Sequence, residues 1–386
     1  MVTSADQIYT LSREGLEAMW QALAGAGHRV VGPRVRDGAI VYDVLEGSRE
    51  LPWGWTAQQG PAQYTLERRL DGAAFGWAVG PQSLRRFVQP ARERLWTAVG
   101  SSDGFTIEDE PLGDDAPLAF FGVRACDLAA LAVQERVFIG GEFVDVRALA
   151  RRRGIFVVAV DCTEPGGSCF CASMQTGPGV TSGHDVALTE RAGGAGGPVY
   201  LARAGTERGA AWLAGLDFAE AGDEAVAEGR AAVEEASGRM GRSMPDVDLR
   251  AVIAARTESR YWEEIGARCL ACSNCTLVCP TCFCMTVEDV TDLAGERSER
   301  HRRWDSCFGL DFSYLHGGAV RRAVGARYRQ WMSHKLSTWW DQFGTSGCVG
   351  CGRCITWCPV GIDITEGAAR LAAEVNDTAG EDDGDP

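Results

Sequence analysis

The sequence predicts an α/β N-terminal domain with a mostly parallel sheet, followed by an all-α C-terminal domain. Two apolar runs of strand length, Leu118–Val123 and Ile155–Val160, indicate strands that are buried on both faces, as in parallel sheets. The cysteine-rich half of the chain has helical apolar spacing instead, for example over 249–267. With 386 residues, 45% of them hydrophobic, the chain is expected to fold into two or three globular domains.

The segment between the two apolar runs predicts a helix, which completes a strand–helix–strand unit. Asp127 is placed to cap this helix, which is expected to run from Leu128 to about Val137. The segment Ser237–Pro245, at the end of a stretch rich in glycine, alanine and acidic residues, predicts a linker before the helical part. The expected domains are therefore an α/β domain over 1–236, a linker over 237–248, a helical domain over 249–375 that contains most of the cysteines, and a disordered acidic tail over 376–386.

Charge and hydropathy exclude several classes of function. The formal charge of −15 argues against binding to the phosphate backbone of nucleic acids. No apolar stretch approaches the about 18 residues of a membrane span, and the first residues lack the layout of a signal peptide. We therefore expect a cytoplasmic protein that binds neither nucleic acid nor membrane. Among its 38 basic residues, only Lys335 is a lysine.

Eight of the 15 cysteines form two copies of one motif. The spacing C-x2-C-x2-C-x3-C-P occurs at 269–280 and again at 348–359. In two-cluster ferredoxins the first three cysteines of such a motif bind one [4Fe–4S] cluster and the fourth binds the other cluster. Zinc motifs more often contain paired cysteines. The spacing therefore predicts a first set of ligands, Cys269, Cys272, Cys275 and Cys358, and a second set, Cys348, Cys351, Cys354 and Cys279.

Four further cysteines follow the two predicted parallel strands. Cys126 comes directly after the first strand, and Cys162, Cys169 and Cys171 lie in one glycine-containing loop after the second. Ligands of open parallel sheets bind beyond the carboxyl ends of the strands, so we expect these thiols to converge. This third set predicts a third [4Fe–4S] cluster. The alternative is that the four are buried thiols that pack as small hydrophobic residues.

Three cysteines, Cys282, Cys284 and Cys307, belong to none of these sets. They could bind a further metal or replace a ligand in one of the three sets. The simpler interpretation, which we favour from the sequence, is that they are thiols packed beside a cluster. The sequence alone assigns these three thiols no single role.

Six segments together resemble a known family: Gly122–Leu128, Cys169–Met174, Arg268–Cys272, Cys279–Cys284, Trp304–Cys307 and Cys348–Cys354. In this order they resemble the iron–sulfur beta subunit of cytosolic NAD(P)-linked [NiFe] hydrogenases of the sulfhydrogenase type. The electron-transfer subunit of anaerobic sulfite reductase is similar over the same span, roughly residues 25 to 370. The resemblance implies an electron-transfer role. Its implied partners are the small and large hydrogenase subunits together with a flavin-bearing, NAD(P)-binding reductase, or the catalytic subunit of a sulfite reductase.

The expected function is a relay of single electrons, because iron–sulfur clusters change by one electron whereas nicotinamide carries a hydride. No G-x-G-x-x-G motif follows a predicted strand, so we do not expect a nicotinamide site on this chain, and we expect it not to be catalytic alone. An enzyme whose cluster binds substrate at a free coordination position is the second hypothesis. A structural zinc or interaction protein is the third.

Overall fold

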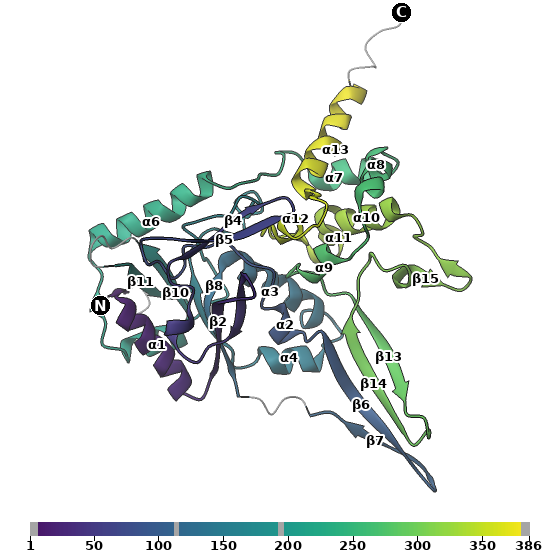
Figure 1. Cartoon of the computed structure of the whole chain (residues 1–386), viewed down its shortest axis with the longest axis horizontal. Helices are drawn as coiled ribbons and strands as arrows, with labels where there is room; N and C mark the ends of the chain where they lie inside the picture. Colours follow the sequence, from purple (N-terminus) through teal and green to yellow (C-terminus); the bar gives the residue numbers. More distant parts are fainter. Residues whose placement is uncertain (1–6, 112–115, 192–196, 380–386) are drawn as a thin grey trace, which may run out of the picture.

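The computed structural model describes residues 7–111, 116–191 and 197–379. Its N-terminal body is built around a large sheet, and helices of the C-terminal region gather beside one end of that body (Figure 1). Within the described ranges, no helix has the length and apolar character needed to span a bilayer. Of the predicted acidic tail, residues 380–386 lie outside the described ranges, whereas its first residues belong to a helix that continues to Ala379.

The large sheet has eight strands in the order β12-β1-β11-β10-β9-β8-β2-β3. The strands are β1 (Ile8–Leu11), β2 (Arg29–Arg36), β3 (Ala39–Val44), β8 (Leu118–Arg124), β9 (Phe156–Val160), β10 (Val186–Arg191), β11 (Val199–Ala204) and β12 (Ala219–Glu220). Every residue of β8 and of β9 is buried, as the two apolar runs predicted. These two strands are neighbours in the interior of the sheet.

The sheet is mixed, so the prediction of a mostly parallel sheet is only partly correct. The pairs β2–β8, β8–β9 and β9–β10 are parallel, whereas β2–β3, β10–β11, β1–β11 and β1–β12 are antiparallel. The antiparallel strands flank the parallel centre on both sides. A turn at Asp37 and Gly38, both at positive φ, connects β2 to β3 and explains the antiparallel pair on one flank.

Helices cover the sheet and connect its strands (Figure 1). They are α1 (Arg13–Gly25), α3 (Ala125–Phe138), α4 (Val146–Arg152), α5 (Glu207–Ala214) and α6 (Asp223–Gly238). In α1, Leu16, Met19 and Leu23 repeat at helical spacing and are buried in the same apolar core as the central strands. Burial of each such side chain stabilises the fold by about 1.5–3 kcal/mol. The predicted linker over 237–248 begins in the last turn of α6 and ends at the residue that caps the next helix.

Helix α3 begins earlier than predicted. Its first residue is Ala125, so Asp127 lies inside the first turn and does not cap the helix. Both Cys126 and Asp127 are consequently buried at the end of β8. Asp127 instead forms a buried ion pair with Arg353, so its carboxylate has a different structural role from the predicted cap.

A second sheet corrects the expectation that the C-terminal domain is all-α. This sheet is antiparallel, with the strand order β13-β14-β6-β7, and it projects from the body (Figure 1). Its strands are β6 (Arg92–Ser101), β7 (Gly104–Asp109), β13 (Met285–Thr291) and β14 (Arg297–Trp304). The hairpin of β13 and β14 therefore joins a hairpin from the N-terminal part of the chain. Two smaller hairpins consist of β4 (Trp55–Gly60) with β5 (Gln63–Arg68), and β15 (Tyr314–Leu315) with β16 (Gly318–Ala319).

The remaining C-terminal region consists mainly of short helices around an aromatic core. They are α7 (Leu249–Ala255), α8 (Tyr261–Arg268), α9 (Asn274–Leu277), α10 (Val324–Ser333), a π-helical turn (His334–Thr338), α11 (Trp339–Phe343), α12 (Arg353–Thr356) and α13 (Ile364–Ala379). Trp262, Tyr328 and Trp331 form the centre of this core, and several cysteines of both motifs pack against its edge. The helix predicted over 249–267 is divided into α7 and α8.

Candidate metal centres

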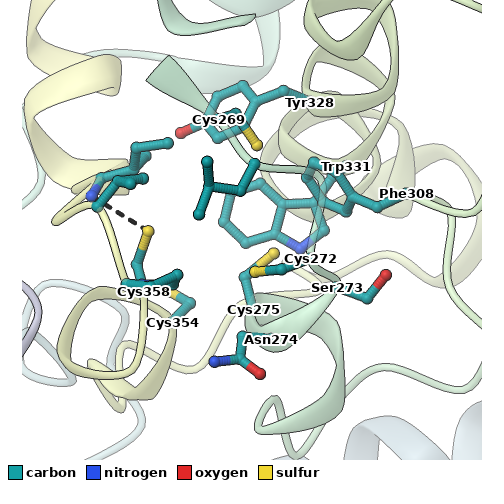
Figure 2. Close-up of a pocket in the computed structure, with 14 residues that line it drawn as sticks. Cys269, Cys272, Ser273, Asn274, Cys275, Phe308, Tyr328, Trp331, Cys354 and Cys358 are labelled. Atoms are coloured by element: carbon teal, nitrogen blue, oxygen red, sulfur yellow. Dashed lines mark hydrogen bonds between the residues drawn. The ribbon is translucent and has the colours of Figure 1, made fainter.

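The four cysteines of the first set line one pocket (Figure 2). Cys269 follows α8, Cys275 lies in α9, and Cys358 follows α12. Between the first three cysteines the backbone turns through Ala271 and Ser273, both in the left-handed region, so that the chain wraps around the pocket. The structure thus brings together thiols that are separated by most of the C-terminal region.

The walls of this pocket combine backbone donors with aromatic side chains. The amide of Ala271 lies 3.4 Å from the Cys269 sulfur, and the amide of Ile362 lies 3.3 Å from the Cys358 sulfur. Rings of Phe308, Tyr328 and Trp331 close another side of the pocket (Figure 2). Hydrogen bonds to cluster sulfurs and exclusion of solvent are two means by which proteins set cluster potentials. The donor set therefore fits a thiolate-bound iron–sulfur cluster.

One edge of the pocket reaches the surface. All 15 cysteines lie in the described ranges, and Cys272 is the only exposed one. The neighbouring Leu270 is 64% exposed. On the inner side, burial raises the pKa of the Cys275 thiol well above its usual value, and neighbouring thiols raise it further. The pocket thus has one solvent-facing edge and one buried edge.

The cysteines of the second set also lie close to one another. Burial raises the pKa of the Cys354 thiol well above its usual value. The thiols of Cys348, Cys351 and Cys279 face it and raise this pKa further. Burial also raises the pKa of Cys348 to about 12. The amide of Gly350 points at the Cys348 sulfur at 3.5 Å. As the spacing predicted, Cys279 of the first motif is near the three leading cysteines of the second motif.

Lys335, the single lysine of the chain, reaches this second set. It lies in the π-helical turn and is only 4% exposed. Its ammonium donates to the Cys279 sulfur at 3.2 Å and to the hydroxyl of Thr281 at 3.0 Å. A hydrogen bond from Cys282 lowers the pKa of Cys279 well below its usual value, and the charge of Lys335 lowers it further. The Cys282 thiol and the Lys335 ammonium thus both favour the thiolate form of Cys279, which is the form that binds metals.

The third set converges at the carboxyl ends of β8 and β9, which are neighbours in the sheet. The thiols of Cys169 and Cys162 face that of Cys171, and the thiol of Cys171 faces that of Cys126. Burial raises the pKa of Cys169 to about 12, an effect that the nearby Cys162 thiol increases. The amide of Gly166 points at the Cys169 sulfur at 3.3 Å. The predicted convergence at this edge of the sheet is therefore present.

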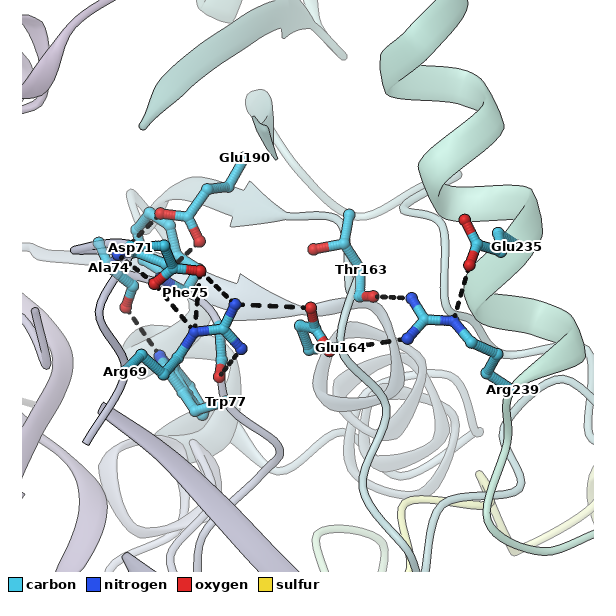
Figure 3. Close-up of polar contacts among 12 residues, drawn as sticks. Arg69, Asp71, Ala74, Phe75, Trp77, Thr163, Glu164, Glu190, Glu235 and Arg239 are labelled. Carbon is cyan, nitrogen blue, oxygen red and sulfur yellow. Dashed lines mark hydrogen bonds and ion pairs between the residues drawn. The ribbon is translucent and has the colours of Figure 1, made fainter. Parts of the chain in front are cut away.

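Ion pairs fix the loop that carries three cysteines of the third set (Figure 3). Glu164 of this loop lies 3.6 Å from the Arg69 guanidinium and 3.8 Å from the Arg239 guanidinium, on opposite sides. Arg239 also donates to the carbonyl of Thr163 at 2.9 Å. Near Arg69, the buried carboxylate of Glu190 accepts hydrogen bonds from the backbone amides of Ala74 and Phe75. The loop is thereby attached through Arg69 to the hairpin of β4 and β5, and through Arg239 to the end of α6.

A buried ion pair connects the second and third sets. Arg353, which stands between Cys351 and Cys354, approaches Asp127, the neighbour of Cys126, at 2.9 Å, and both side chains are fully buried. The hydroxyl of Tyr42 donates to the same carboxylate at 3.1 Å. No sequence motif indicates this pair. Its only signal is that a charged residue, Asp127 or Arg353, stands directly beside a cysteine in each of the two segments.

The remaining cysteines lie close to the other sets. Cys282 contacts Cys279, and the thiols of Cys284 and Cys307 face each other. Across the described residues, no three histidine, cysteine, aspartate or glutamate side chains are arranged closely enough to hold a single metal ion. The thiolates of a cubane cluster stand farther apart than the ligands of one ion, because each thiolate binds a different iron.

Comparison with known proteins identifies the C-terminal region. A family model described as a 4Fe-4S dicluster domain matches residues 268–362, which contain both cysteine motifs. The chain is 30% identical over 252 residues to the protein named Sulfhydrogenase 2 subunit beta of Pyrococcus furiosus. This alignment covers 64% of the chain and 72% of the relative. No solved structure matches the chain.

Proposed function

We propose, for a chain that belongs to the family of sulfhydrogenase beta subunits, a function as the iron–sulfur subunit that relays single electrons within a hydrogenase complex. The 4Fe-4S dicluster domain implies electron transfer. The observation that supports the relay most directly is the pocket of the first set, where thiols from both motifs surround one space. When bound, iron–sulfur clusters supply one-electron transfer at potentials between about −700 and +450 mV.

The ligand assignment is part of this proposal. We assign one [4Fe–4S] cluster to Cys269, Cys272, Cys275 and Cys358, a second to Cys348, Cys351, Cys354 and Cys279, and a third to Cys126, Cys162, Cys169 and Cys171. The pocket around the first set, the neighbours of Cys354 and the convergence of the third set at the sheet edge support the three assignments. Amide donors at one sulfur or more in each set would stabilise bound thiolates.

The side chains around these sets have distinct tasks in the relay. Phe308, Tyr328 and Trp331 exclude water from the inner side of the first set. Lys335 places a positive charge against the second set. The exposed edge at Cys272 and Leu270 is where the redox centre of a partner protein would come closest. These features give the chain a surface for electron entry or exit and a protected interior.

The proposed partners are the small and large subunits of a [NiFe] hydrogenase and a flavin-containing subunit that binds NAD(P). The name of the Pyrococcus furiosus relative favours this complex over the alternative, the electron-transfer subunit of an anaerobic sulfite reductase. The test is to mix the purified, cluster-loaded chain with NADH or NADPH and a viologen dye. We expect no dye reduction until a flavoprotein partner is added. Dye reduction by the chain alone would refute the relay and favour an enzyme in its own right.

The assigned sets also predict a metal content. Twelve cysteines in three sets correspond to about twelve iron and twelve sulfide. Replacing Cys169 and Cys171 together by serine should remove about four of each and leave the signals of the first two clusters. An iron content unchanged by this double substitution would eliminate the third cluster from the proposal.

A further inference from the structure

Three thiols outside the assigned sets are brought together at the base of the hairpin of β13 and β14. Cys284 directly precedes β13, and Cys307 follows β14. The amide of Asp305 donates to the carbonyl of Cys284 at 2.9 Å, which ties the two ends of the hairpin together. The thiols of Cys284 and Cys307 face each other, and Cys282 is buried and faces Arg85, as Cys284 does. This arrangement places all three cysteines between the first and second sets.

A buried guanidinium points into the same place. Arg85 is only 2% exposed and stacks 3.8 Å from the centre of the Trp304 ring. Its Nε donates to Gln89 at 2.9 Å and its Nη1 to the carbonyl of Thr276 at 3.2 Å. Its Nη2 is buried and has no hydrogen-bond partner in the described part of the chain. None of the contacts that Arg85 makes there is with a carboxylate, so its charge is not balanced by an acidic side chain.

The titratable groups that face Arg85 are the thiols of cysteines. The strongest interaction is with Cys282, followed by Cys279 and Cys284. Cys279 is already held by the ammonium of Lys335 and belongs to the second set. Cys282 and Cys284 are therefore the groups available to balance Arg85. A neutral thiol supplies no charge, and it is a weak hydrogen-bond acceptor.

A buried cation without an anionic partner is costly, and the cost disappears if the thiols are metal-bound thiolates. Three thiols between the first and second sets, next to a buried guanidinium that has no anionic partner in the described part of the chain, fit an anionic metal–thiolate centre better than three neutral side chains. We propose that Cys282, Cys284 and Cys307 hold a further iron–sulfur centre, toward which Arg85 directs its free N–H group. Three thiolates leave one corner of a [4Fe–4S] cluster for a ligand other than cysteine.

This inference rests on the proposed function in one respect, namely that the metal bound by the thiols is iron in an iron–sulfur centre. It adds a fourth centre to the three assigned sets. The expected content of the fully loaded chain rises from about twelve to about sixteen iron. The centre would stand between the first two sets, because Cys307 faces Cys275 of the first and Cys282 contacts Cys279 of the second.

The test compares the full-length, anaerobically loaded protein with the double variant Cys284→Ser, Cys307→Ser. Iron, zinc and acid-labile sulfide are measured, and the reduced proteins are examined by EPR. We expect the variant to lose about four iron and four sulfide while the signals of the two ferredoxin-type clusters remain. The control is Ser306→Ala. Ser306 is buried and directly precedes Cys307, and this change removes a hydroxyl but no thiol, so it should keep the full iron content.

Several results would overturn the inference. An unchanged iron content in the double variant would show that these cysteines are ordinary thiols, and zinc in place of iron would exclude an iron–sulfur centre. A wild-type chain that binds no iron would refute the proposed function as well. A wild-type chain that binds about twelve iron, with an unchanged iron content in the double variant, would overturn only this inference and leave the relay intact, so the two failures are distinguishable.

Two measurements do not depend on how the double variant folds. In the loaded wild-type protein, alkylation followed by mass spectrometry should label Cys284 and Cys307 only after the iron has been chelated. Equal labelling before chelation would contradict the centre. Arg85→Met removes no thiol, so it should keep the iron content, and at a fixed potential it should lower the reduced-to-oxidised ratio of this centre about tenfold. An unaffected ratio would contradict the role of Arg85.

Discussion

Replacing Lys335 by methionine should make the cluster of the second set harder to reduce. Methionine has similar length but no charge, and the side chain it replaces is almost completely buried. The Lys335 ammonium lies 3.2 Å from the sulfur of Cys279. Reduction adds negative charge to the cluster, and a nearby positive charge stabilises that state. Removal of the ammonium therefore lowers the reduction potential.

The size of the shift follows from Coulomb's law. At 3.2 Å and an effective dielectric constant of about 20, a full electron charge on the sulfur would interact with the ammonium by about 5 kcal/mol. The added charge is spread over the cluster, and if about a quarter of it lies on the side facing Lys335, about 1.3 kcal/mol remains. For a one-electron couple this corresponds to about 55–60 mV. The shift is large enough to measure by redox titration.

The assay is an EPR-monitored redox titration of the loaded protein, together with iron analysis to show that no cluster is lost. Lys335→Arg keeps the charge and should restore most of the wild-type potential. Arg329→Met removes a charge at the surface, where Arg329 is paired with Glu258, and should leave the potential nearly unchanged because solvent and salt screen it. If Lys335→Met keeps all iron and leaves this potential unchanged or raises it, the reasoning is wrong.

Two further predictions concern the connections between the sets. Cys358→Ser and Cys269→Ser should alter the same reduced-cluster EPR signal, and a Cys358→Ser spectrum that matches that of Cys348→Ser would show that each motif binds its own cluster. Asp127→Asn leaves the charge of Arg353 buried without its partner and should destabilise the protein by about 3–5 kcal/mol, seen as loss of cluster absorbance at a lower temperature. The control Asp341→Asn breaks an exposed ion pair and should cost less than about 1 kcal/mol; equal melting of the two variants would contradict the role of the buried pair.

The features that sequence could predict are those that local patterns encode. Continuous apolar runs predicted β8 and β9, and the position of the cysteines after these strands predicted the convergence of Cys126 with Cys171. Motif spacing predicted that Cys279 lies near the second motif and Cys358 near the first, because the fourth cysteine stands a helical turn beyond the third. In each case a few adjacent residues carry the whole signal.

The features that sequence could not predict depend on distant partners. Strands β13 and β14 are mostly polar, so they lack the alternation of a half-buried strand. They are held by pairing with β6 and by cross-strand ion pairs such as Arg300 with Asp289 and Arg303 with Glu288. No local motif in the sequence indicates that Arg85 lies beside Cys282 and Cys284. Nonlocal charge pairs leave no periodicity in the sequence, and only the folded chain shows them.

The contacts among the sets give the proposed relay an order. The first set has the exposed edge at Cys272. It is linked to the second set because Cys358 of the second motif lines the pocket of the first set, and Cys279 of the first motif faces the second set. The second set meets the third directly, because the Cys351 thiol faces those of the third set. A side chain at Gly350 would lie 2.6 Å from backbone of the loop that carries the third set, so this approach requires glycine. In the proposed relay, an electron that enters at Cys272 would reach the third set by way of the second, along the boundary between the large sheet and the C-terminal helices.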